Sequence, residues 1–260
     1  LNETGVLVHV VDFSGETDIE GEATENHDPR EDIAFLENEI DMWYLDVLEK
    51  GIERHLSGYH GGDGDVEEAL GEQMDAFGIV AEEIKQVILR QGIGFDPEAW
   101  DDDEREALAR EIRKRTKPIV IAANKMDTPA AQENWDEITG EAQYDHLDFV
   151  PVSAHAEKSL KKASEGGIID YTPGEEEFEI VGDVSDEQEQ GLEQIREFVD
   201  AYGGTGVQET LETALFDTLG CMGVFPGSAN GSKDEKGVFR DCFILPAGGT
   251  VEDFAYTIHS

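Results

Sequence analysis

The sequence predicts an α/β fold in which a parallel sheet is interrupted by a helical insertion and followed by a small β-rich module. Two continuous apolar runs, Val6–Val11 and Pro118–Ala123, are typical of strands that are buried on both faces of a parallel sheet. Between Asp12 and Asn124 lie roughly 110 residues with helical periodicity, far more than a single crossover helix needs. After Val224 the pattern changes to short strands and turns, which indicates a separate module.

The chain is strongly acidic, with 61 Asp and Glu against 19 Lys and Arg among 260 residues and a net charge of −42. The acidic residues are interleaved with regularly spaced apolar positions, whereas a disordered acidic tail would lack such spacing. This distribution is typical of proteins from extreme halophiles, where molar salt shortens the Debye length to about 3 Å and screens the repulsion between carboxylates. An acidic mimic of nucleic acid is the alternative, and it is the weaker one because the charge is not localised.

Nothing in the sequence indicates a membrane-bound or secreted protein, because no apolar run has the length of a membrane span and no signal peptide is present. Cys221 and Cys242 form no CxxC or His-paired pattern, so we expect reduced thiols in a cytoplasmic protein, and no metal site in these residues. We expect a monomer that does not bind DNA. Because the sequence starts at Leu1 within what reads as structured sequence, we also expect it to be a fragment of a longer protein.

The insertion is predicted to be helical from its first residues. Asp28 can cap a helix that has Pro29 in its first position. Apolar side chains recur at helical spacing over Ile33–Ile52 and again over Val66–Ile88. These two stretches predict an antiparallel, coiled-coil-like two-helix arm, and a third helix at about 102–115 leads back to the sheet.

The apolar run 118–123 ends in Asn124-Lys125-Met126-Asp127, which matches the N-K-x-D base-reading loop of GTP-binding proteins. Ligands of open α/β sheets bind just beyond the carboxyl ends of the strands, where this motif is predicted to lie. The Asp127 carboxylate can accept two parallel hydrogen bonds, from the ring N–H and the exocyclic amine of guanine. Adenine offers no such pair of donors and would leave the carboxylate unpaired. The stem of Lys125 can lie along the base plane, and the Asn124 amide can tie the loop to its neighbours.

A second short strand ends in Ser153-Ala154-His155. Small residues are needed at such a turn when the backbone itself must approach a ligand, and in G domains its N–H groups meet the guanine carbonyl oxygen. An ordinary strand and turn is the alternative, but the position after N-K-x-D favours the base site. The candidate nucleotide-binding residues are therefore Asn124, Lys125, Met126, Asp127, Ser153, Ala154 and His155.

Two further motifs are attributed to structure rather than to phosphate binding. The run 12–15, Asp-Phe-Ser-Gly, matches D-x-x-G, but no phosphate-binding strand and loop precede it and an acidic loop follows it. The run 203–206, Gly-Gly-Thr-Gly, is followed by no Lys-Ser/Thr pair, and we interpret it as punctuation between helices predicted at 186–201 and 207–219. The sequence contains no G-x-x-x-x-G-K-[ST].

The segment Leu245–His259 resembles the signature of the TGS domain, a small ubiquitin-like (β-grasp) fold. Thr250 is predicted to cap the helix that follows, with Asp253 in the capping-box position. Tyr256 and His259 can contact RNA or protein, and core packing is an equal alternative for each.

The N-K-x-D loop, a helical insertion before it and a C-terminal TGS-like segment together resemble one family, the YchF (Obg-like) translation-associated P-loop NTPases. The resemblance covers essentially the whole chain and implies a partial P-loop NTPase G domain of a halophilic archaeal type. It predicts four segments: G domain at 1–28, helical insertion at 29–116, the base-reading part of the G domain at 117–222 and an incomplete TGS domain at 223–260. Relatives from bacteria and eukaryotes commonly replace N-K-x-D and prefer ATP, so the intact motif predicts a preference for guanine.

The resemblance implies a cytoplasmic GTPase that uses GTP and Mg²⁺ and associates with the ribosome, its RNA or its proteins. The phosphate lysine, the Mg²⁺ ligands and the catalytic residues belong to the family's P-loop and switch regions, and we expect them upstream of residue 1. These 260 residues are therefore expected to read guanine without hydrolysing GTP. Two alternatives remain. One is a nucleotide-independent scaffold that binds the ribosome or RNA through the helical arm and the TGS domain. The other is a Drg-type GTPase, which the long insertion disfavours.

Overall fold

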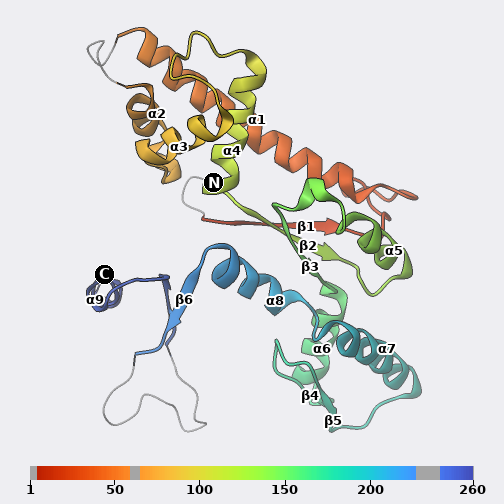
Figure 1. The fold of residues 1–260 in the computed structure, drawn as a ribbon. Helices are drawn as coiled ribbons and strands as arrows, with labels where there is room; N and C mark the ends of the chain where they lie inside the picture. Colours follow the sequence, from red (N-terminus) through yellow and green to blue (C-terminus); the bar gives the residue numbers. More distant parts are fainter. Residues whose placement is uncertain (1–4, 59–64, 227–240, 260) are drawn as a thin grey trace.

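The computed structural model describes residues 5–58, 65–226 and 241–259, and a three-stranded parallel sheet forms its centre (Figure 1). The strands β1 (Leu7–Asp12), β2 (Ile119–Asn124) and β3 (Asp148–Pro151) lie in the order β1-β2-β3. Their register places Asp12 opposite Asn124 and Ala123 opposite Pro151. The carboxyl ends of all three strands therefore meet at one edge, and the loops that follow them converge there, as the sequence predicts.

The two faces of the sheet are covered unequally. Strand β2 is buried on both faces, as predicted for a central parallel strand. Strand β1 lies at the sheet edge, and its side chains at Val8 and Val10 are 40% and 61% exposed. The prediction that this first strand is buried on both faces is therefore wrong for the described residues. The reason is that the helical segment 207–218 packs against β2 on this face and leaves β1 uncovered.

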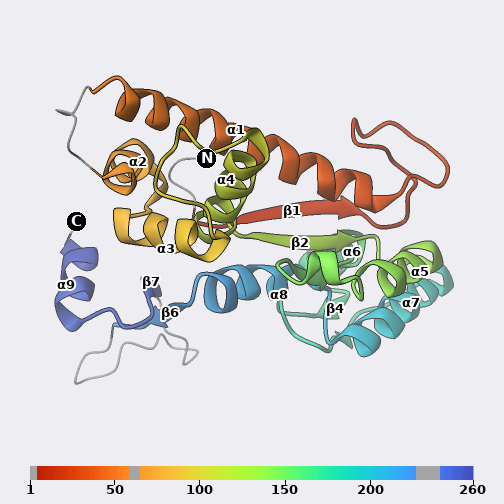
Figure 2. The same cartoon turned by 45° about the horizontal axis from the view of Figure 1, so that its top comes forward.

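The opposite face of the sheet is covered by helices α1 (Pro29–Leu56), α4 (Asp102–Thr116) and α5 (Pro129–Ile138), as Figures 1 and 2 show. The caps at the start of α1 follow the prediction, since Asp28 accepts a hydrogen bond from the Arg30 N–H and a proline occupies the first turn. Helix α1 has 28 residues and contacts both the sheet and other helices of the insertion. Its first half packs near the sheet, and its second half packs with the rest of the insertion.

The insertion differs from the predicted two-helix arm. The stretch predicted as one helix over Val66–Ile88 is divided into α2 (Val66–Met74), a 3₁₀ turn (η1, Asp75–Phe77) and α3 (Ala81–Gln91). The break follows from Gly78, which adopts a left-handed conformation with φ of 75°, and from Ile79, which is buried just after it. Because the chain turns back here, α2 packs directly against α3, and both join α1 and α4 in a compact cluster instead of a coiled coil.

A buried ion-pair network joins α1 to α4. Arg113 is only 1% exposed, and its guanidinium nitrogens lie 2.7 Å from Glu37 and 2.7 Å from Asp41. Burial acts to raise the pKa of Glu37, but hydrogen bonds from His146 and Arg113 outweigh it and hold that pKa below its usual value. His146 Nε2 lies 2.7 Å from the same carboxylate, so the network extends to the loop before β3.

The remaining elements before the C-terminal module all come after β2 in chain order, and all but the first come after β3. They are η2 (Ala142–Tyr144), α6 (Ala154–Glu165), the short antiparallel pair β4 (Ile169–Asp170) and β5 (Glu179–Ile180), α7 (Asp186–Tyr202), α8 (Val207–Glu212) and η3 (Thr213–Thr218). The helix predicted at 186–201 is confirmed. The one predicted at 207–219 is present, but its second half is a π-helical segment. In the described part of the chain, no helix combines the length and apolar character that a membrane crossing would require.

The C-terminal module is described in part. Strands β6 (Cys221–Val224) and β7 (Phe243–Pro246) pair antiparallel, and helix α9 (Val251–His259) follows. The predicted capping box is confirmed, because the N–H and hydroxyl of Thr250 each donate to Asp253 at 2.7 Å and the Asp253 N–H donates back to the Thr250 hydroxyl at 3.2 Å. Residues 227–240 lie outside the description, and the TGS assignment stays a prediction.

Replacing Arg113 by Met should destabilise the protein by about 3–5 kcal/mol, because two carboxylates would remain partly buried without their cation. Chemical unfolding would measure this, with Arg110→Met as the matched control. Arg110 also pairs with Asp41 but is 46% exposed, so its loss should cost about 1 kcal/mol or less. Equal effects of the two substitutions would contradict a structural role for the buried network.

Candidate functional site

The N-K-x-D motif begins at the last residue of β2 and forms the loop after it, and its four residues range from buried to exposed. Met126 is fully buried in the main core and anchors the loop, so its side chain is not available to a ligand. Lys125 adopts a left-handed conformation, with φ of 64°, which turns its side chain out of the strand direction. Asp127 is exposed, and in the described part of the chain no hydrogen bond or ion pair engages its carboxylate. An exposed carboxylate without a partner is free to accept hydrogen bonds from a ligand.

The loops after β2 and β3 are tied to each other through the backbone and through Asn124. The Val152 N–H donates to the Ala123 carbonyl at 2.8 Å, and the Met126 N–H donates to the Val152 carbonyl at 3.1 Å. The Asn124 side-chain oxygen accepts from the Ala154 N–H at 3.1 Å, which confirms that the Asn124 amide ties the loop to its neighbour. The two predicted motifs are therefore hydrogen-bonded to each other.

The turn after β3 also begins a helix. Ser153 is fully buried and caps α6, its hydroxyl accepting from the Ala156 N–H at 3.1 Å. The Ala154 N–H is occupied by Asn124, so it differs from the predicted free donor. Among the described residues, no acceptor engages the next N–H, that of His155. A free N–H in the first turn of a helix is suited to a carbonyl oxygen or an anion.

Lys125 is held by two carboxylates from the loop after β1. Its ammonium lies 2.9 Å from Asp12 and 3.1 Å from Glu16. Asp12 also accepts from the N–H and hydroxyl of Ser14 and from the N–H and hydroxyl of Thr17, at distances between 2.6 and 3.0 Å. The loop that begins with D-x-x-G therefore positions the lysine of N-K-x-D.

The electrostatics of this contact keep both groups charged. Partial burial acts to raise the pKa of Asp12, but hydrogen bonds from Ser14, Thr17 and Lys125 outweigh it and lower that pKa to about 2. Burial likewise opposes the charge of Lys125, yet its bonds to Asp12 and Glu16 raise its pKa above the usual value. Sequence reasoning missed this role of Asp12, although its position at the end of a strand next to β2 was a signal.

The glycine run 203–206 packs against the turn after β3. The Ser153 N–H donates to the Thr205 carbonyl at 3.0 Å. Gly206 has φ of 78°, and a Cβ at this position would lie 1.9 Å from the Pro151 carbonyl oxygen, so only glycine fits. The predicted punctuation between helices is present, and the same glycines also permit a close approach to the base-reading turn.

A buried carboxylate reinforces this support. Glu157 on α6 accepts hydrogen bonds from the hydroxyls of Tyr171 and Thr205, each at 2.7 Å. Burial acts to raise the pKa of Glu157, but these bonds and one from Lys161 outweigh it and lower that pKa. The contacts are long-range in sequence, and no local pattern could have revealed them.

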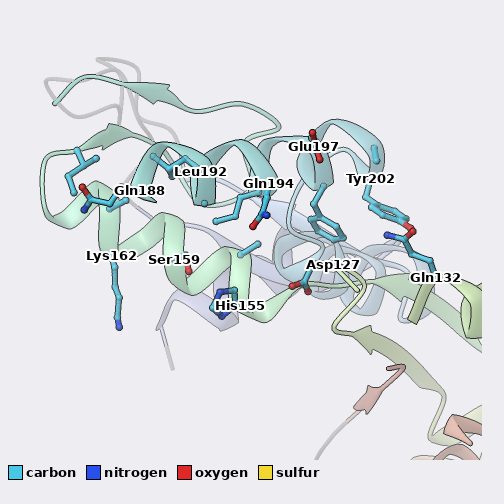
Figure 3. A pocket seen from close by; sticks show the side chains of 17 residues that line it. Asp127, Gln132, His155, Ser159, Lys162, Gln188, Leu192, Gln194, Glu197 and Tyr202 are labelled. Atoms are coloured by element: carbon cyan, nitrogen blue, oxygen red, sulfur yellow. The ribbon is translucent and has the colours of Figure 1, made fainter. Parts of the chain in front are cut away.

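A cavity of about 810 Å³ opens beside the two loops, within the size range of small-molecule sites. Helices α6 and α7 form its walls, and Figure 3 shows Asp127 and His155 between its two ends, with Gln132 and Tyr202 toward one of them. Lys162 lies toward the other end, and Leu192 and Phe198 contribute apolar surface from α7. The site thus combines apolar walls with a carboxylate acceptor and a free backbone donor.

The described residues contain no group of three or more His, Cys, Asp or Glu side chains arranged to hold a metal ion.

Comparison with known proteins places this geometry in a family. Residues 122–228 match the family model described as "Obg-like GTPase YGR210-like, G4 motif-containing domain". A GTP-binding protein of Methanocaldococcus jannaschii is 37% identical over 264 residues, and one of Schizosaccharomyces pombe is 30% identical over 271 residues. The chain covers 65% and 63% of these two relatives, slightly less than two thirds of their length, and the alignments take in 100% and 96% of the chain.

A solved structure, that of a GTP-binding protein from Pyrococcus horikoshii, matches with a TM-score of 0.74 and 34% identity over 100% of this chain and 70% of its own. The fold, the sequence and the N-K-x-D loop agree, and the chain belongs to the Obg-like family of GTP-binding proteins.

Proposed function

We propose that this protein binds GTP through the loops after β2 and β3 and that the whole protein hydrolyses GTP with Mg²⁺. The observation that carries the proposal is the exposed Asp127 carboxylate, which has no partner in the described part of the chain and lies where two loops are hydrogen-bonded to each other. The names of the relatives, all GTP-binding proteins, support the same ligand.

Guanine is the base that this arrangement suits. The Asp127 carboxylate accepts from the ring N–H and the exocyclic amine, and the free His155 N–H donates to the ring carbonyl oxygen. The stem of Lys125 lies against the base plane, at a place fixed by Asp12 and Glu16. Adenine has neither the pair of N–H donors that the Asp127 carboxylate accepts nor a ring carbonyl for the His155 N–H. We therefore expect GTP to be preferred over ATP.

The phosphates are bound, on this proposal, by a P-loop that the whole protein carries in addition to these 260 residues, which contain no such motif. The greater length of the relatives supports this, as does the apolar edge of β1 at Val8 and Val10, which a further strand and helix of a P-loop NTPase would cover. The phosphate lysine, the Mg²⁺ ligands and the catalytic residues belong to that segment.

The finer assignment is a YchF-like protein of a halophilic archaeal type. The helical insertion between β1 and β2, the hairpin and capped helix at the C-terminus and the net charge of −42 support it. It implies a cytoplasmic monomer that associates with the ribosome or its RNA. A scaffold that ignores nucleotide would leave the unpaired Asp127 carboxylate without a role.

Replacing Asp127 by Ala in the full-length protein should weaken GTP binding about 10- to 100-fold, since hydrogen bonds to a charged group contribute about 1.5–3 kcal/mol. ATP binding should change little, so the preference between the two nucleotides should collapse in a competition assay. Asp170→Ala, at another exposed carboxylate, is the control. An unchanged preference, or no GTP binding by the unaltered protein, would sink the proposal.

Replacing Asp12 by Asn should lower GTP affinity severalfold, because Lys125 loses its charged anchor. A double-mutant cycle with Lys125→Ala tests whether Asp12 acts through the lysine or through the loop as a whole. If Asp12 acts through Lys125, the losses of GTP affinity should be strongly non-additive; additive losses would refute that role. Glu16→Gln, at a carboxylate 66% exposed, should have the smaller effect.

The lowered pKa of Asp12 predicts that the effect of Asp12→Asn on the free energy of unfolding depends on pH. Since the pKa of Asp12 is lowered to about 2 in the folded state, its stabilising contribution is complete above the unfolded pKa of about 3.9 and is lost as pH falls toward 2. The difference in unfolding free energy between the unaltered protein and Asp12→Asn should therefore be constant above about pH 5 and shrink below about pH 4. A difference that grows on acidification would show that the assigned contact is wrong.

A further inference from the structure

Basic residues are scarce in this chain, yet they concentrate on one helix. Six of the 19 Lys and Arg residues fall within 105–117, which spans most of α4 and its end. Arg113 and Lys117 are buried, and the others reach the surface to differing degrees. In a chain of net charge −42, such a local excess of positive charge requires an explanation.

A hollow of about 430 Å³ lies between α3 and α4, and four basic side chains line it; we call it the basic hollow. The lining residues on each helix recur at intervals of three and four residues, so each helix contributes one face to the hollow. From α3 they are Val87, Arg90 and Gln91, and from α4 they are Ala107, Arg110, Glu111, Lys114 and Arg115.

The charges in the basic hollow are incompletely neutralised. Glu111 is the one acidic residue of the lining, and it lies 3.9 Å from Lys114. Arg110 pairs with Asp41 at 3.0 Å and is still 46% exposed. In the described part of the chain, Arg90 and Arg115 are exposed and form no ion pair. The hollow therefore offers several cations to an external anion.

Helix polarity explains only part of this arrangement. Cations in the last turn of a helix interact favourably with its dipole, by about 0.3–1 kcal/mol each, which accounts for Arg90 on α3 and for Lys114 and Arg115 on α4. Helix polarity does not account for Arg110, which lies before the last turn of α4. It also does not explain why the cations of α3 and those of α4 line the same hollow.

The chemistry of the basic hollow fits a phosphate backbone better than a protein surface. Protein interfaces are centred on aromatic and apolar residues, whereas the apolar side chains here are Val87, which is almost fully buried, and the small Ala107. Three of the four cations are arginines, whose planar groups bind phosphate through paired hydrogen bonds. Several cations spread over more than one helical turn suit a polyanion rather than a single small ion.

The basic hollow is separate from the base-reading loops. It lies beside the end of α4, just before β2 begins, whereas Asn124–Asp127 follow the other end of that strand. Six residues of extended chain span about 20 Å, so the residues that line the basic hollow are not those that contact the base.

We propose that the basic hollow between α3 and α4 binds the phosphate backbone of RNA. The inference rests on the proposed association with ribosomal RNA and names the surface that makes the contact. It does not depend on GTP binding.

The test measures binding of a fluorescent oligouridylate to the full-length protein by anisotropy, from low to molar salt. In the hollow variant, Arg90, Lys114 and Arg115 are all replaced by Ser. Affinity at low salt should fall at least tenfold, and the slope of log K against log salt should decrease by about 2, since each lost phosphate contact on a single strand removes about 0.7. GTP affinity should stay unchanged.

The matched control replaces Lys50, Arg54 and Lys158, three exposed cations outside the hollow, with Ser and so changes the net charge equally. An equal loss in both variants overturns the proposal, because net charge alone would then explain binding. Stronger binding of a polyglutamate peptide than of the oligouridylate also overturns it.

Two further outcomes are distinguished. If the hollow variant fails to fold, Arg90→Lys with Arg115→Lys keeps the charge and should retain the salt slope of the unaltered protein; a lost slope there contradicts the assignment. If the unaltered protein binds no RNA, the proposed RNA association fails as well. If it binds RNA and the hollow variant binds equally, the inference alone fails.

Discussion

The parallel register of three strands is the constraint on which the site depends. Because β1, β2 and β3 run in one direction, with Asp12 opposite Asn124 and Ala123 opposite Pro151, three loops distant in sequence emerge at the same edge. The backbone bonds that join Met126 to Val152 and Val152 to Ala123 then fix two of these loops as a unit. The third loop contributes Asp12, which holds Lys125. A shift of register would separate the acceptor, the lysine and the helix N-terminus.

The protein uses its few cations where their charge has a defined partner. Lys125 is placed by Asp12 and Glu16, and Arg113 joins two helices through Glu37 and Asp41. In a chain with 61 acidic residues, repulsion between carboxylates is the background, and each paired cation relieves it locally. The cations of the basic hollow stand apart from this pattern because several of them face solvent.

The sequence predicts features that depend on local patterns. The buried run ending at Asn124, the cap at Asp28 and the reciprocal bonds of Thr250 and Asp253 follow from residues close in sequence. The break at Gly78 was not predicted, because the apolar spacing of one long helix continues across it. The exposure of Val10 depends on which helix covers an edge strand, and that is decided by the tertiary arrangement.

The candidate site divides in the same way. The N-K-x-D motif and the Ser-Ala turn are short, and their position at strand ends made them recognisable. The anchoring of Lys125 by Asp12 and the support of Ser153 by Thr205 join residues far apart in sequence. The occupied Ala154 N–H and the free His155 N–H depend on where one amide oxygen points, which composition and spacing cannot specify.

Base reading by Asp127 is tested most directly by the affinity of the unaltered full-length protein for inosine triphosphate relative to GTP. Inosine lacks only the exocyclic amine, so one of the two bonds to Asp127 is lost while the ring carbonyl and its bond to the His155 N–H are kept. We expect inosine triphosphate to bind about 10- to 100-fold more weakly than GTP. Equal affinities would show that Asp127 does not read the base.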